Sequence, residues 1–120
     1  MSGEGANVYR VFNALAAPAS SAAYKIYGSR NVTCYLSVSP AGTATATVNI
    51  EVSPQAGTPT IWIPAQWLTG SPLETSPGVI GLTATNAVYV ASWSIPVVQI
   101  RYRVSALAGG TLDAWLQVEL

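Results

Sequence analysis

Histidine is absent from this 120-residue sequence, cysteine occurs once, and only 8% of the residues are charged. The lack of histidine removes the commonest general base, the commonest metal ligand and the usual pH switch. A single cysteine, Cys34, excludes a disulfide within the chain and any zinc site built from several cysteines. We therefore expect a protein that is not an enzyme, with no catalytic residues, no cofactor and no metal ion.

The formal net charge is zero, because the sequence has five Lys/Arg residues and five Asp/Glu residues. A nucleic-acid binder relies on a basic face, and so does a protein held at a membrane by a polybasic patch. No stretch approaches the roughly 18 uninterrupted apolar residues of a membrane span. Residues 1–5 lack the basic and apolar regions of a signal peptide. We expect no nucleic-acid partner, no membrane partner and synthesis in a cytoplasm.

Alternation of apolar and polar residues with a period of two is the main structural signal. It is clearest in residues 99–105 and 111–119, where the even-numbered positions are apolar. These two runs predict half-buried strands joined by residues 108–110 as a hairpin, since a glycine-containing loop of three residues matches their faces. That pairing would set Arg103 opposite Trp115 in a cation–π contact.

A second hairpin is predicted in the same way from residues 32–38 and 44–52, with residues 39–43 as its turn. Cys34 then falls on the apolar face as a small buried hydrophobe. Shorter strands are predicted at residues 22–27, 60–63, 79–84 and 87–93, with the last two paired to each other.

About eight short strands with frequent turn signals predict an all-β fold, either an antiparallel β-sandwich or a jelly-roll. Residues 24–120 would form a single β-sandwich domain. Residues 1–23 are rich in small side chains and irregular in pattern, so they are either an N-terminal arm or a first strand. Several strands lack the charged residues that protect a sheet edge, so we expect their edges to be short, covered or paired with another subunit.

Tryptophan and arginine side chains are the candidate binding residues, because these residue types carry much of the energy at protein interfaces. The tryptophans have three alternative roles: packing in the core, contacting another subunit, or stacking against a sugar ring. The candidate interface residues are Trp62, Trp67 and Trp93, with Arg101, Arg103 and Trp115 as a contact patch on the polar face.

Two stretches carry a resemblance to a known class of proteins. Residues 46–53 (ATVNIEVS) followed by 60–63 (TIWI), and residues 98–107 (VQIRYRVSAL) followed by 109–116 (GGTLDAWL), resemble small β-sandwich virion structural proteins of tailed bacteriophages. In those proteins the loop after the first of these strands usually carries an acidic, glycine-containing turn. Residues 54–58 (PQAGT) have the glycine but lack the acid.

The resemblance implies a structural protein of the virion, made in a bacterial host, without catalytic residues. The leading hypothesis is a capsid decoration (cement) protein, a homotrimer that bridges and stabilises subunits of the major capsid protein. One alternative is another head, tail or baseplate component with a different virion protein as its partner. A carbohydrate-binding β-sandwich module and a small hydrolase with two neighbouring carboxylates are the rival hypotheses from other classes.

Overall fold

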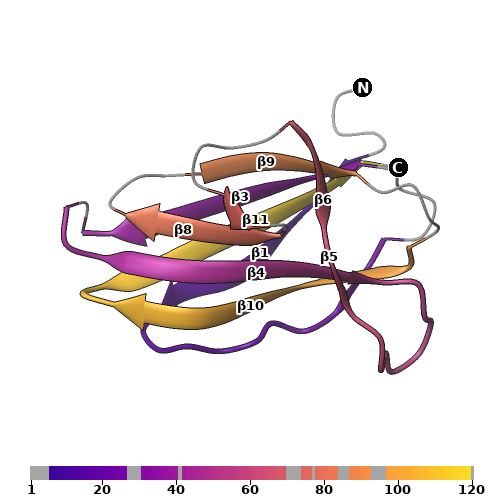
Figure 1. Cartoon of the computed structure of the whole chain (residues 1–120), viewed down its shortest axis with the longest axis horizontal. Helices are drawn as coiled ribbons and strands as arrows, with labels where there is room; N and C mark the ends of the chain where they lie inside the picture. The colour runs from indigo at the N-terminus through magenta and orange to yellow at the C-terminus, as the bar shows by residue number, and fades with distance from the viewer. Residues whose placement is uncertain are drawn as a thin grey trace.

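A computed structural model describes residues 6–26, 31–40, 42–69, 74–76, 78–83, 87–92 and 97–119. Within these ranges every regular element is a β-strand, and the strands form two antiparallel sheets packed face to face (Figure 1). The all-β fold and its sandwich architecture are therefore confirmed. The strands are β1 (Ala6–Leu15), β2 (Tyr24–Lys25), β3 (Asn31–Ser39), β4 (Thr45–Ser53), β5 (Ile63–Pro64), β6 (Gln66–Thr69), β7 (Glu74–Ser76), β8 (Val79–Thr83), β9 (Ala87–Ser92), β10 (Gln99–Ala108) and β11 (Thr111–Glu119).

The two sheets share the strands unevenly. One has five strands in the order β1-β11-β3-β9-β6, and the other has the order β2-β10-β4-β8-β7 with β5 added beside β4. In Figure 1, β4, β8 and β10 lie in front of β1, β3 and β11. Since β2, β5 and β7 have only two or three residues each, eight of the eleven described strands have four or more.

The core between the sheets consists largely of the apolar positions that alternation predicted, and Phe12, Ala65 and Val97 complete it from outside the predicted runs. On β10 and β11 the even-numbered residues from Ile100 to Val104 and from Leu112 to Val118 are buried, as are those on β3 and β4. Cys34 is fully buried among them, which confirms the prediction for that residue. Successive side chains of a strand point to opposite faces, so the odd-numbered residues from Arg101 to Ser105 on β10 and from Thr111 to Gln117 on β11 point outward. A register shift follows Val104, and beyond it Leu107 packs against the core.

The predicted hairpins are wrong, because each joins strands that the structure places in different sheets. β3 pairs with β11 and β9, whereas β4 pairs with β10, β8 and β5. β10 pairs with β4 and β2, whereas β11 pairs with β1 and β3, and β8 and β9 are separated in the same way. Each connection therefore crosses from one sheet to the other. An arch of this kind buries the same apolar positions as a hairpin, so alternation cannot distinguish the two.

Two of these arches pack against each other at one end of the sandwich. The ends of β3 and β10 and the starts of β4 and β11 lie together at the left of Figure 1. A Cβ atom added to Gly109 would collide with the carbonyl oxygen of Thr43, and one added to Gly110 would collide with that of Ser39. The two glycines are thus required by close backbone contact between the arches.

Two predicted strands are shorter or displaced in the structure. The strand expected at residues 22–27 is reduced to β2, and the one expected at residues 60–63 begins only at Ile63. In both places a side chain replaces part of the backbone ladder. The hydroxyl of Ser21 accepts a hydrogen bond from the N–H of Tyr102, and the amide oxygen of Gln55 accepts one from the N–H of Ile61.

The N-terminal part of the described chain spans both sheets. β1 is an edge strand of the five-stranded sheet, paired with β11. After Leu15 the chain crosses to the other sheet, where the N–H of Val104 donates to the carbonyl of Ala19 and the N–H of Ser21 donates to the carbonyl of Tyr102.

Candidate functional site

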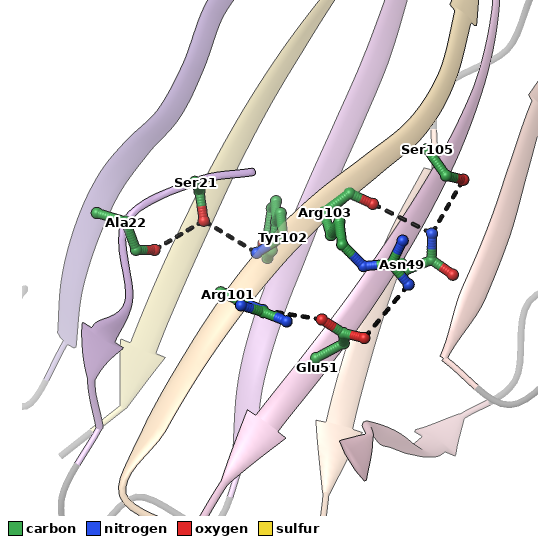
Figure 2. A network of polar contacts seen from close by, with 8 residues as sticks. All are labelled: Ser21, Ala22, Asn49, Glu51, Arg101, Tyr102, Arg103 and Ser105. Atoms are coloured by element: carbon green, nitrogen blue, oxygen red, sulfur yellow. Dashed lines mark hydrogen bonds and ion pairs between the residues drawn. The ribbon is translucent and has the colours of Figure 1, made fainter. Parts of the chain in front are cut away.

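Arg101 and Arg103 project from the outer face of the six-stranded sheet, on either side of buried Tyr102. Glu51 on β4 lies directly opposite Arg101 in the register. Its Oε1 accepts a hydrogen bond from Nε of Arg101 at 2.8 Å, and its Oε2 lies 3.4 Å from a terminal nitrogen of Arg103 (Figure 2). One carboxylate thus holds two guanidinium groups, and this cluster carries one uncompensated positive charge.

Trp62 belongs to the same face because the guanidinium of Arg101 lies over its ring, 4.2 Å from the ring centroid. A cation over an aromatic ring is attracted by the negative face of the π system. Glu51 holds the guanidinium from the side while Trp62 lies beneath it. We name Trp62, Arg101, Glu51 and Arg103 the front cluster.

The loop that carries Trp62 is fixed by two glutamines. The amide oxygen of Gln55 accepts hydrogen bonds from the N–H groups of Thr60 and Ile61, both at 2.7 Å. The amide nitrogen of Gln99 donates to the carbonyls of Gln55 and Gly57 at 2.9 and 3.0 Å. Gln99 is only 2% exposed, so the loop covers it and is held over the start of β10. Sequence reasoning missed both glutamines, since Gln55 lies in a loop and a glutamine such as Gln99 on the polar side of a strand is ordinarily solvated.

Trp115 lies on the other side of the molecule, on the outer face of the five-stranded sheet. The guanidinium of Arg10 lies 4.3 Å from its ring centroid and also contacts Oδ1 of Asp113 at 2.7 Å. The predicted contact between Arg103 and Trp115 is therefore wrong. β11 pairs with β1 and not with β10, and the register sets Arg10 opposite Trp115. We name Trp115, Arg10 and Asp113 the rear cluster.

Asp113 is anchored more tightly than a surface carboxylate usually is. Its Oδ1 accepts a hydrogen bond from the N–H of Ala14 at 2.9 Å in addition to the contact with Arg10. These two donors, the Ala14 N–H foremost, lower the pKa of Asp113 below its ordinary value. Ala14 has a positive φ of 53°, so this hydrogen bond fixes a backbone conformation that alanine rarely adopts.

The six predicted interface residues thus do not form one patch. Trp62, Arg101 and Arg103 lie together in the front cluster, and Trp115 lies on the opposite face. The backbone of Trp67 belongs to β6, opposite Ala91 of β9, in the five-stranded sheet. Trp93 lies outside the residues that the structure describes.

A buried hydrogen bond connects the two sheets behind these clusters. The hydroxyl of Tyr102, on β10, donates to the carbonyl of Trp115, on β11, at 2.9 Å. The same hydroxyl neighbours the thiol of Cys34, and burial raises the pKa of Cys34 to about 12. Burial also raises the pKa of Tyr102. Both groups are therefore neutral at physiological pH and serve the core.

The acidic side chains with described contacts are separated by the sandwich. Glu51 contacts arginines on one outer face, and Asp113 contacts an arginine on the other. Across the described ranges, no three histidine, cysteine, aspartate or glutamate side chains gather in a way that could hold a metal ion. The described residues form no helix that is long and apolar enough to cross a membrane.

No protein-family model matches this chain, and no curated protein sequence matches it. Among solved structures, the fold is similar to that of the SPBc2 prophage-derived protein YomS, with a TM-score of 0.67. The aligned region covers 94% of this chain and 91% of that chain, at 11% sequence identity. At this identity the similarity establishes a shared sandwich fold over nearly the whole length of both proteins.

Proposed function

We propose that this chain is a non-enzymatic structural protein of a bacteriophage virion, and more specifically a capsid decoration (cement) protein. The observation that carries the proposal is the fold, which matches a prophage-derived protein over 94% of the chain. Under this proposal the protein is made in the cytoplasm of a bacterial host and acts in the virion. Its partners are subunits of the major capsid protein.

The placement of the two clusters supports a bridging role. The front and rear clusters lie on opposite outer faces, so each can contact a different capsid subunit. In both clusters a carboxylate holds the arginine that covers the tryptophan. Side chains that are already ordered lose less conformational entropy when they bind, which favours affinity. Tryptophan and arginine are also the residue types that most often dominate interface energies.

Many copies on one shell would add their contacts together, because each bound module raises the effective concentration of the next contact. We propose that the protein works as a homo-oligomer for this reason. The sequence analysis predicts a trimer, and a dimer is the alternative assembly. A head, tail or baseplate component is the alternative placement within the virion.

The clusters favour protein contacts over sugar binding. A carbohydrate platform requires tryptophan rings that are exposed on the same face. The structure describes the side chains of two of the four tryptophans, Trp62 and Trp115. These two lie on opposite faces, and a guanidinium group lies over each ring. A sugar would have to displace the arginine or use the remaining part of the ring.

Co-sedimentation with capsids of the encoding phage, assembled without this protein, tests the proposal. We expect saturable binding to assembled capsids and none to free capsid subunits. Trp62→Ala and Trp115→Ala would each weaken binding, whereas Thr45→Ala, an exposed position at the far end of β4 from Glu51, would not. If the protein binds purified tails or baseplates and ignores capsids, the alternative placement is correct.

A further inference from the structure

β1 forms an edge of the five-stranded sheet. In the described part of that sheet its neighbour is β11 alone, so the other side of its backbone faces away from the sheet. An edge strand presents N–H and C=O groups that can pair with another chain. Proteins usually prevent such pairing with short strands, charges, prolines or bulges.

The other sheet edges in the described chain are protected by their length or shape. β2 has two residues, β7 has three, and β6 has four with a register shift in its pairing. β1 has ten residues. Its first five, from Ala6 to Arg10, pair with β11 without any shift, and the irregularities begin only after Arg10. Among these edges, β1 alone offers a regular stretch of this length.

This regular stretch also exposes apolar side chains. Of the three large hydrophobic residues exposed in the described chain, Val8 at 64% and Tyr9 at 36% lie on β1. The ring of Tyr9 contacts Tyr24, with centroids 5.3 Å apart, at the margin between the two sheets. Arg10, the charged residue of the stretch, is held by Asp113 and Trp115 on the sheet's outer face. It therefore does little to protect the backbone edge.

We propose that the occupant of this edge is a second copy of the chain, with the two β1 strands paired antiparallel and Val8 at the two-fold axis. Val8 is the middle of the regular stretch, so this register pairs all five residues with their counterparts. It sets Val8 opposite Val8 of the second copy, and apolar residues directly opposite each other stabilise a sheet.

The charges favour the same register. Centring on Val8 places Arg10 opposite Ala6 of the second copy. Centring on Arg10 would instead place two cations opposite each other, which is unfavourable. The self-paired edge is also antiparallel, like every pairing within the sandwich.

The product would be one continuous sheet made from two five-stranded sheets. Because the outer faces continue across the axis, the rear clusters of both copies would lie on the same side. The arrangement is isologous and closes with two copies. This dimer depends on the edge of β1, and it does not require any particular binding partner in a virion.

The test combines mass measurement with substitutions at Val8. Sedimentation equilibrium of the full chain, between about 1 μM and 1 mM, should show a monomer–dimer equilibrium. Val8→Lys should raise the dissociation constant by at least about tenfold, because two ammonium groups would face each other at the axis. Ile61→Lys is the matched control, since Ile61 is 51% exposed but lies outside β1. It should leave the equilibrium unchanged.

Cross-linking tests the register independently. Val8→Cys should form a disulfide-linked dimer under mild oxidation, because residues opposite each other at the axis are within reach of such a bond. Ile61→Cys should not, and native Cys34 is buried. A monomer throughout the concentration range would overturn the inference, and so would a trimer that Val8→Lys leaves intact. Capsid binding by Val8→Lys is a separate readout, so the inference and the proposed function can fail independently.

Discussion

The Tyr102 hydroxyl provides the most direct test of how the two sheets are joined. The side chain is fully buried on β10, and its hydroxyl donates a 2.9 Å hydrogen bond to the carbonyl of Trp115 in the opposite sheet. Tyr102→Phe keeps the ring and removes only the hydroxyl. The change therefore removes the donor to Trp115, together with the hydroxyl's contact with the Cys34 thiol, from an otherwise unchanged core.

The expected cost follows from the bond and from the carbonyl left behind. A buried hydrogen bond contributes about 0.5–1.5 kcal/mol net, and an acceptor left without its donor costs about 1–3 kcal/mol. The Trp115 carbonyl has a second lone pair, so we expect the lower part of that range. The free energy of unfolding should fall by about 1–2 kcal/mol, and Tm by roughly 4–8 °C for a chain of this size.

Urea unfolding, followed by tryptophan fluorescence and by circular dichroism, measures this loss and checks that the two transitions coincide. Tyr35→Phe is the matched control. Tyr35 is only partly buried on β3, so removing its hydroxyl should change the stability by less than about 0.5 kcal/mol. Equal stabilities for Tyr102→Phe and Tyr35→Phe would mean that the buried Tyr102 hydroxyl does not stabilise the contact between the sheets.

Three further predictions concern other parts of the sandwich. Asp113→Asn should lower the free energy of unfolding by about 0.5–1 kcal/mol at pH 7. Because folding lowers the pKa of Asp113, the difference in urea midpoint between the variant and the native chain should shrink as the pH falls below about 4. Gly110→Ala should destabilise by roughly 1–3 kcal/mol in the same assay, since its Cβ would meet the Ser39 carbonyl, whereas an isolated hairpin loop would tolerate it. Cys34 should resist a thiol reagent at pH 8 until urea unfolds the chain, and rapid labelling of the native protein would contradict its burial.

The alternation in the sequence was sufficient to predict the buried faces but not the pairing of the strands. In residues 99–105 and 111–119 the even-numbered positions are buried, as expected. A hairpin within one sheet and an arch between two sheets both require apolar residues at these positions. The deciding contact is between Gly109–Gly110 and the backbone of Ser39 and Thr43, which are distant in sequence. No local pattern carries that information.

The residue types of the candidate site could be predicted from the sequence, but which of these residues lie together could not. Arg101 and Trp62 were expected at an interface and do contact each other. Arg10 was missed as the partner of Trp115, because the predicted hairpin placed Arg103 opposite Trp115 and the irregular pattern of residues 1–23 does not show which strand they join. Gln99 was missed because its burial depends on a loop that folds back over the strand.

Thermal disassembly of capsids with and without this protein measures the bridging role itself. We expect saturating protein to raise the disassembly temperature. Trp62→Ala and Trp115→Ala should each reduce this gain, because a bridge needs both faces. An unchanged disassembly temperature at saturating, demonstrated binding would contradict the bridging role.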